Sequence, residues 1–365
     1  MAAAIVNFDR DDGRLKLAWD DGSESAHHYI WLRDNCGCSA CGDKVSTSGE
    51  RFLRLTDVPA DIAPAEVAVG ADGGLCITWN HGGHTSRYDP AWLRARGDVG
   101  QSPVLWDGRL TGAVPEVAYG DIKAGPRPLM EHLSSHGLAL VRDVGSENDE
   151  IERLAGLLGF IRQTHYGRIF EIRSRENNVT LAETKHAIPP HNDELFRDAP
   201  PGVIVFHCLE TSADGGGASV MVDGFNVAAR LREINPGAFD LLSRVPLPHR
   251  RRIDGAADLR AETTMIGLDG AGNVTAFRCN ERTLAPLALP GDQMKPVYDA
   301  LQAVLELVYD PAMKIEHLLH SGEAMVFDNH RVLHARTAFG GRRHVRQCHV
   351  DRDEVFSRLR LLQAS

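Results

Sequence analysis

Apolar and polar residues alternate in short runs through about the first 95 positions, which is the pattern of half-buried β-strands. The stretch AIVNFDRDDGRLKLAWDDGSES alternates on both sides of Asp-Asp-Gly, a tripeptide that favours a tight hairpin turn. The stretch GGLCITWNHGGHTSRYDP has the same character. We therefore expect a small β domain over residues 1–100.

The pattern changes further along the chain. Residues from about 95 to 119 show little periodicity, and we interpret them as a linker that enters a second domain over residues 101–365. PLMEHLSSHG then has helical spacing with a terminal glycine, and LALVRDV after it has the pattern of a strand. NDEIERLAGLLGFI predicts an amphipathic helix with Asn148 as its N-cap.

Apolar runs typical of strands dominate the rest of the chain: GVIVFHCL, GASVMVDGF, VTAFRCN, EAMVFDNHRVLHART and HVRQCHVD. Helices are predicted near 227–234 and 293–308. Many strands with a few helices favour a mainly β fold with flanking helices (α+β), in which the second domain is a double-sheet jelly roll.

Composition narrows the class of protein. The 365 residues carry a formal net charge of -10 and are 43% hydrophobic, which indicates a globular protein and argues against nucleic-acid binding. No apolar run reaches the roughly 18 residues of a membrane helix, and the N-terminus does not resemble a secretory signal. We expect a cytoplasmic protein, in which the seven cysteines are reduced.

The stretch KHAIPPHNDELFRD places His191 and Asp193 two positions apart. In an extended segment these two side chains point to the same side, so they can hold one metal ion; the alternative is a polar turn. FDNHRVLHART supplies further histidines, His330 and His334, and arginines follow. Two histidines and one carboxylate suit a non-haem Fe(II) oxygenase, and an arginine can clamp the carboxylate of 2-oxoglutarate.

Three of the cysteines, Cys36, Cys38 and Cys41, lie within six residues in WLRDNCGCSACGDK. Structural zinc prefers four nitrogen or sulfur ligands, and His81 or His84 can complete such a set. The alternative is three ordinary buried thiols. The remaining cysteines lie singly in strand-like runs and are expected in the core: Cys76, Cys208, Cys279 and Cys348.

These motifs resemble the γ-butyrobetaine hydroxylase family of Fe(II)/2-oxoglutarate dioxygenases, within the taurine-dioxygenase-like group. The likeness extends over nearly the whole chain, through W-L-R-D-N-C-x-C-x-x-C at 31–41, LGFIRQTHYG, PPHND, PPGVIVFHCLETSADGG, VDGFNVAARL, FDNHRVLHART and DRDEVFSRLRLL. It implies that His191, Asp193 and His334 ligate iron. It also implies that His84, in HTSRYDPAWL, completes the zinc site of an N-terminal domain, and that His330 is not a ligand.

The resemblance also implies where the cosubstrate binds. The family ending R-H-L-x-G-x-Y-x-D, counted back from Asp351, places the 2-oxoglutarate arginine at Arg343. Arg346 is the alternative, although strand alternation puts it on the opposite face. Ser219 matches a position that often hydrogen-bonds the cosubstrate. The expected cofactors are Fe(II), 2-oxoglutarate as cosubstrate and structural zinc, with ascorbate helpful in vitro.

Family substrates carry a quaternary ammonium group, which aromatic faces bind by cation–π attraction. Tyr166 and Phe170 match two positions of the aromatic cage, unless they are simply core aromatics. Glu183 and His349 stand where tyrosines are expected, so γ-butyrobetaine itself is in doubt. The candidates for binding the acidic end of the substrate are Asn192, Asn280 and Arg282.

We therefore expect an enzyme that uses O₂ to hydroxylate a C–H bond of a small betaine-like substrate, with succinate and CO₂ as co-products. The alternative substrates are trimethyllysine, a trimethylammonio-alkylphosphonate or another amino-acid-like molecule. A homodimer is expected from the family. A different class of protein, a non-catalytic jelly roll that binds a metabolite, would be indicated by a missing ligand or arginine, and none is missing.

Overall fold

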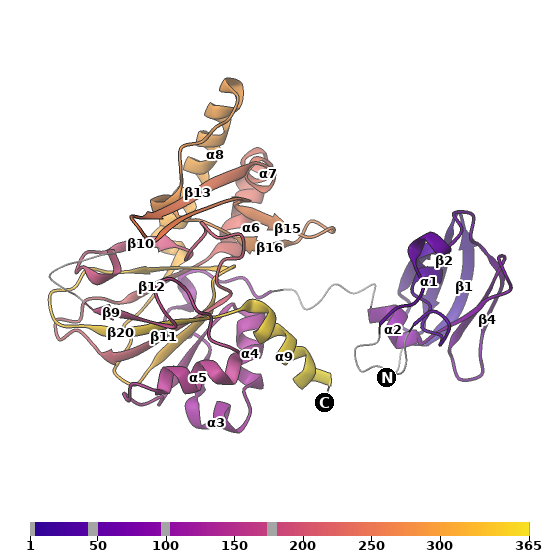
Figure 1. The fold of residues 1–365 in the computed structure, drawn as a ribbon, viewed down its shortest axis with the longest axis horizontal. Coiled ribbons are helices and arrows are strands. Elements are labelled where there is room, and N and C mark those ends of the chain that lie inside the picture. Colours follow the sequence, from indigo (N-terminus) through magenta and orange to yellow (C-terminus); the bar gives the residue numbers. More distant parts are fainter. Residues whose placement is uncertain (1–3, 43–49, 96–102, 174–180, 365) are drawn as a thin grey trace. The chain divides into compact units, whose positions relative to one another are not determined.

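The computed structural model describes residues 4–42, 50–95, 103–173 and 181–364. The chain divides into two compact units, Met1–Gln101 and Ser102–Ser365 (Figure 1). The expected domain boundary between residues 100 and 101 falls outside the described residues.

The N-terminal unit contains two three-stranded antiparallel sheets. One sheet consists of β1 (Ile5–Asp11), β2 (Arg14–Trp19) and β3 (Glu24–His28), and the other of β4 (Pro64–Val69), β5 (Leu75–Trp79) and β6 (Thr85–Tyr88). Two short helices accompany them, α1 (Tyr29–Asp34) and α2 (Pro90–Ala95). The turn between β1 and β2 is the expected one, because Asp11 pairs with Arg14 and Gly13 takes the left-handed φ of +71° that the tight turn requires.

Alternation along these strands builds the core of the unit. Leu15, Leu17 and Trp19 are buried on β2, and Leu75, Ile77 and Trp79 are buried on β5, while the residues between them are more exposed.

The C-terminal unit is built around two sheets that are antiparallel except for the β7–β8 pair. The larger sheet has the order β7 (Glu116–Ala118), β8 (Leu138–Arg142), β18 (Ala324–Asp328), β11 (Val203–Glu210), β20 (His344–Val350) and β9 (Ile169–Arg173). The smaller sheet has the order β10 (Ile188–His191), β19 (Val332–Arg336), β12 (Ser219–Asp223) and β17 (Lys314–His317). One hydrophobic cluster joins the two sheets, with Phe206 and Phe327 from the larger and Met221 and Ile315 from the smaller.

Helices cover the outer faces of the two sheets (Figure 1). One layer packs on the larger sheet and contains α3 (Tyr119–Ala124), α4 (Arg127–Ser135), α5 (Glu150–Leu158) and α9 (Arg352–Ala364). The other layer packs on the smaller sheet and contains α6 (Gly224–Ile234), α7 (Pro236–Arg244) and α8 (Gly291–Tyr309). Two hairpins adjoin it, β13 (Pro246–Ile253) with β14 (Ala257–Thr264), and β15 (Ile266–Leu268) with β16 (Val274–Phe277). The fold is therefore a mixed one, with strands and helices both prominent.

Part of the segment interpreted as a linker belongs to the core of this unit. Trp106 is buried, and its indole N–H donates to the His136 carbonyl at 2.7 Å. A buried ion pair fixes the backbone two residues before Trp106. Arg331 contacts both carboxylate oxygens of Asp223 at 2.9 Å and also donates to the Val104 carbonyl. Residues 103–119 are therefore part of the second domain, and interpreting them as a linker is wrong. The sequence pattern did not show this, because their packing partners lie far away along the chain.

Most predicted elements are present, with exceptions. The predicted helices near 227–234 and 293–308 correspond to α6 and α8. The prediction that Asn148 caps α5 is wrong, because Asp149 occupies the N-cap and no side chain caps that helix. Helix α7 and the β13–β14 hairpin were not predicted. No helix in the described parts of the chain is long and apolar enough to cross a bilayer.

Candidate active site and metal centres

The C-terminal unit contains a cavity of about 350 Å³. Its walls come from both sheets, through β9, β10, β11, β12, β19 and β20, and from β13 and the 3₁₀ turn η4 (Glu281–Thr283). A cavity of this size suits a small ligand, and the residues predicted to bind iron lie in its wall.

His191, Asp193 and His334, here called the triad, lie together in this wall. His191 ends β10 and pairs in register with His334 on β19, and their ring centroids are 4.1 Å apart. Asp193 follows directly, with Oδ1 at 3.4 Å from His191 Nε2 and 3.7 Å from His334 Nε2. All three ligand atoms lie within 4.8 Å of one another, so one ion can contact all of them.

The protonation states of the triad suit a metal. Burial lowers the pKa of His334 well below its usual value, so the imidazole is neutral. Burial alone would raise the pKa of Asp193, but its close contacts with the side chains of His334, His191 and His349 hold that pKa well below its usual range, so the carboxylate is ionised. The His191 Nδ1–H group donates a hydrogen bond to the Pro189 carbonyl at 2.9 Å. The lone pair of Nε2 is therefore free to ligate a metal. These are the forms of histidine and aspartate that ligate metals.

A second layer of residues orients Asp193. The Gln347 amide nitrogen donates to Asp193 Oδ2 at 2.6 Å and to His349 Nε2 at 2.8 Å, so Oδ1 remains directed at the histidines. Asn329 accepts from the Asp193 N–H at 2.7 Å. Glu194, the next residue, has a φ of +55°, a strained conformation that these contacts help to hold. Gln347 and Asn329 were not predicted from the sequence; only the spacing of Gln347 from His349 on one strand could have indicated the role of Gln347.

A serine and an arginine elsewhere in the wall have polar groups that no other described residue contacts by a hydrogen bond. Arg343, just before β20, is 7% exposed and has no hydrogen bond or ion pair with any described residue; its guanidinium lies 6.0 Å from the Phe339 ring. Ser219, the first residue of β12, has a buried hydroxyl with no hydrogen-bond partner in the described parts of the chain. Gly217 makes room, since a Cβ there would lie 2.7 Å from Arg343 Cδ. A buried cation and a hydroxyl without partners fit an anionic ligand such as the carboxylate of 2-oxoglutarate.

Two other arginines are not available for this purpose. Arg346 lies outside the cavity, because Val345, Gln347 and His349 occupy the inner face of β20 and Arg346 points the other way. Its guanidinium contacts Glu171 at 2.8 Å and the Asn148 carbonyl. Arg336 lines the cavity but donates to three backbone carbonyls, those of Ala182, Thr184 and His186.

The residues expected to bind substrate divide into two groups. Tyr166, Phe170, Asn280, Arg282 and His349 line the cavity. The Tyr166 and Phe170 rings lie 5.3 Å apart, and burial raises the pKa of the Tyr166 hydroxyl.

Glu183 and Asn192 do not line the cavity. Glu183 is buried in the turn η3 (Leu181–Glu183), whose other residues do line it. Asn192 is fully buried, and its amide group is used within the fold: it donates to the carbonyls of Asn329 and Val332 and accepts from the Cys279 N–H. Its role is to hold the triad loop, because no donor remains for a substrate.

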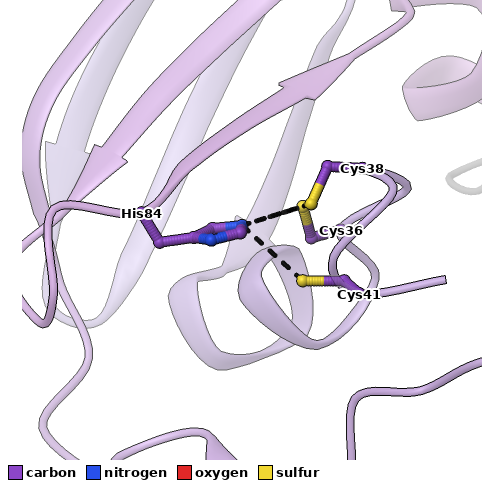
Figure 2. A group of neighbouring side chains, drawn as sticks. All are labelled: Cys36, Cys38, Cys41 and His84. Carbon is purple, nitrogen blue, oxygen red and sulfur yellow. Dashed lines mark hydrogen bonds between the residues drawn. The ribbon is translucent and has the colours of Figure 1, made fainter.

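The N-terminal unit contains the second cluster. Cys36, Cys38 and Cys41 follow helix α1, and the imidazole of His84 from the β5–β6 turn points at their sulfur atoms (Figure 2). The distances from His84 Nε2 to the three sulfurs are 3.3, 3.7 and 3.6 Å. A tetrahedral zinc site has nitrogen–sulfur separations of about 3.6 Å, calculated from its usual bond lengths. His81 is not part of the cluster and contacts Asp61 at 2.9 Å.

Two histidines and one carboxylate beside an unpartnered buried arginine define the class of the site, a non-haem iron oxygenase that uses 2-oxoglutarate. The chain belongs to the taurine catabolism dioxygenase TauD, TfdA family, whose model matches residues 111–349. Residues 6–94 match a family described as gamma-butyrobetaine hydroxylase-like, N-terminal. The alternative of a non-catalytic binding protein is set aside by this membership and the complete triad.

Curated relatives are similar over nearly the whole chain. Gamma-butyrobetaine dioxygenase of Pseudomonas sp. (strain AK-1) is 34% identical, and the alignment spans 96% of this chain and 94% of that protein. Trimethyllysine dioxygenase of Meyerozyma guilliermondii is 30% identical, and the alignment spans 98% of this chain and 96% of that protein. Among solved structures, the non-heme iron oxygenase OrfP, in complex with Fe, succinate and (3S)-hydroxy-L-Arg, has a TM-score of 0.50 at 17% identity. The superposition spans 71% of this chain and 86% of the OrfP chain, so the two proteins share a fold.

Proposed function

We propose that this dioxygenase hydroxylates a C–H bond of a small substrate with a methylated ammonium group and an acidic group, forming succinate and CO₂. One observation carries the proposal: the triad, the unpartnered Arg343 and the Tyr166–Phe170 ring pair line a single cavity. The two relatives are named for γ-butyrobetaine and trimethyllysine, both trimethylated amines, which supports the ammonium group. A trimethylammonio-alkylphosphonate or another amino-acid-like molecule is the alternative for the same chemistry.

The mechanism assigns each group of residues a task. The triad holds Fe(II), which when bound supplies the activation of O₂ that hydroxylation of an unactivated carbon requires. Arg343 and Ser219 receive the distal carboxylate of 2-oxoglutarate, and Gln347 keeps the Asp193 carboxylate in position. The apolar wall, with Phe206 and Val345, excludes water and keeps the reacting C–H bond in place.

Two structural assignments accompany this function. We assign the two sheets of the C-terminal unit to the double-stranded β-helix (jelly-roll) class, supported by their joint core and by the position of the triad at the end of β10 and on β19. We assign a structural zinc ion to the Cys₃His cluster, since four protein ligands leave no open position for chemistry.

The proposal is tested by succinate formation with Fe(II), ascorbate, 2-oxoglutarate and O₂ against a panel of quaternary-ammonium carboxylates and phosphonates. We expect at least one member to raise turnover well above the slow uncoupled rate, with one hydroxylated product per succinate. Matched amines without methyl groups serve as controls. A primary ammonium is strongly hydrated, so moving it from water onto the rings offsets more of the cation–π contribution of about 0.5–2 kcal/mol per ring. Equal stimulation by the unmethylated amines would contradict the proposed substrate.

The role of Arg343 has its own test. Arg343→Gln is expected to raise the KM for 2-oxoglutarate roughly 10- to 100-fold, because a charge-assisted hydrogen bond contributes about 1.5–3 kcal/mol. Arg346→Gln is the control, since this arginine has the same charge but binds Glu171 outside the cavity. A larger rise in the KM for Arg346→Gln than for Arg343→Gln would reverse the assignment.

A further inference from the structure

Arg251 is directed into the cavity by the alternation of strand β13. Leu247 and His249 are buried on this strand, and Arg251 follows them on the same side and lines the cavity. Arg250 and Arg252 point the other way, into solvent, where Arg250 contacts Asp258 at 2.8 Å. One of three consecutive arginines is thus separated from its neighbours by strand geometry.

The same packing brings Arg282 beside the cavity. Arg282 lies in η4, and the chain around η4 is tied to β13 by two contacts. His249 Nδ1 lies 3.0 Å from Thr283 Oγ1, and the Ala285 N–H donates to the Pro248 carbonyl at 2.8 Å. Both guanidinium groups therefore belong to one wall, although 31 positions separate them in the sequence.

Neither of these arginines has a carboxylate partner among the described residues. Arg251 Nε is buried and has no hydrogen-bond partner among the described residues. The Arg251 guanidinium interacts with the Tyr166 hydroxyl and lowers its pKa, although burial raises that pKa by more. Burial lowers the pKa of Arg282, opposed by the Asp193 carboxylate. Two partly buried cations without counter-ions are costly in a folded protein, and such groups concentrate at binding sites.

The other charged groups of the wall do not neutralise this pair. Among the described residues, the acidic ones that line the cavity are Asp193 and Glu194; Asp193 belongs to the triad, and Glu194 forms an ion pair with Arg197. The remaining arginines that line the cavity are engaged elsewhere: Arg343 lies at the proposed cosubstrate site, Arg336 donates to backbone carbonyls, and Arg168 lies 3.8 Å from Glu152. The guanidinium groups of Arg251 and Arg282 therefore remain available to the substrate.

We propose that Arg251 and Arg282 together form the subsite for the acidic end of the substrate, and that they select a doubly charged oxyanion, a phosphonate, over a carboxylate. Two guanidinium forks match the charge and the three oxygens of a phosphonate. The Tyr166 hydroxyl lies beside Arg251 and its ring beside Phe170, so this side chain contributes to both ends of a zwitterionic substrate. The inference rests on the proposed function, in which the substrate has an acidic end.

Binding is measured first, on the enzyme loaded with Fe(II) and saturating 2-oxoglutarate without oxygen. Propylphosphonate and butyrate are titrated calorimetrically above the second ionisation of the phosphonate. We expect propylphosphonate to bind more tightly. Arg251→Gln and Arg282→Gln are each expected to weaken it roughly 10- to 100-fold, while Arg250→Gln, the solvent-facing neighbour on β13, leaves it unchanged. Equal affinity for the two anions, or unchanged affinity in both cavity variants, overturns the inference.

Lysine variants keep the test decisive if a glutamine variant misfolds. Arg251→Lys and Arg282→Lys keep the charge but lose the guanidinium fork, so they are expected to recover part of the affinity. Bound iron and the unfolding temperature report whether each variant is folded. If a glutamine variant fails to fold, its lysine counterpart decides: affinity for propylphosphonate equal to that of the unsubstituted enzyme overturns the inference, and a loss supports it.

Turnover separates this inference from the proposed function. The matched substrates are γ-butyrobetaine and 3-(trimethylammonio)propylphosphonate, which differ in the acidic group. We expect a lower KM for the phosphonate and a rise of KM, more than a fall of kcat, in Arg251→Gln. If neither compound stimulates succinate formation, the proposed function loses support while the calorimetry still decides the subsite. If γ-butyrobetaine turns over with the same KM in both glutamine variants, the subsite is wrong and the function stands.

Discussion

Replacing His334 with alanine is expected to lower substrate-dependent succinate formation by more than about 100-fold. Losing a group that merely supports a metal ligand typically costs 10- to 100-fold in metal affinity or activity, and His334 is placed to be a ligand itself. The two remaining groups, His191 and Asp193, offer only two of the three donor atoms. The measurement is iron content together with succinate produced under saturating Fe(II), 2-oxoglutarate and substrate.

His330→Gln is the matched control for this prediction. His330 lies four residues earlier in the same FDNHRVLHART motif but outside the triad, with Nε2 at 3.4 Å from the Pro200 carbonyl. An amide can replace that contact, so we expect the variant to keep its iron and most of its activity. If His330→Gln lost iron while His334→Ala kept it, the assignment of the third ligand would be wrong.

Replacing Cys36 with serine is expected to remove zinc from the N-terminal unit and to lower its free energy of unfolding by about 4 kcal/mol or more. Cys36 is buried, and its sulfur lies 3.3 Å from His84 Nε2, so its loss opens the ligand set that ties the loop after α1 to the β5–β6 turn. Zinc content by mass spectrometry and hydrogen exchange of residues 36–42 measure the two effects. The strands are expected to keep more protection than this loop, because Trp79 and Leu17 pack in a core that contains no metal ligand.

Cys76→Ser supplies the comparison within the same unit. Cys76 lies on β5 away from the cluster and is only partly buried. The substitution changes the same atom of the same residue type, so we expect full zinc content and little change in stability. Equal loss of zinc in both variants would show that the metal is not held by the Cys₃His cluster.

The chemistry of the site was largely predictable from local sequence. His191 and Asp193 are two positions apart in an extended segment, and Cys36, Cys38 and Cys41 lie within six residues, so short-range geometry already brings these side chains together. Alternation likewise predicted most strands, because one face of each packs against a core. The more distant partners, His334 and His84, entered through resemblance to a family, since spacing alone left His330 and His81 as equal candidates.

Only the tertiary structure decided which polar side chains are free to bind a ligand. Asn192 and Arg336 have the chemistry of binding residues but use it within the fold, whereas Arg343 and Ser219 have no hydrogen-bond partner among the residues that the structure describes. The sequence could not separate these cases, because hydrogen-bond satisfaction depends on groups far away along the chain.

The tertiary structure also decided which face of each strand lines the cavity. Arg251 differs from Arg250, and Gln347 from Arg346, by one position on a strand. Alternation states that the two members of each pair point to opposite sides, and the packing of the second sheet and of η4 determines which side becomes the cavity. The sequence by itself therefore determined the class of chemistry and its nearest ligands. The three-dimensional packing decided the charges that surround the substrate, because those charges come from segments that meet only in the folded chain.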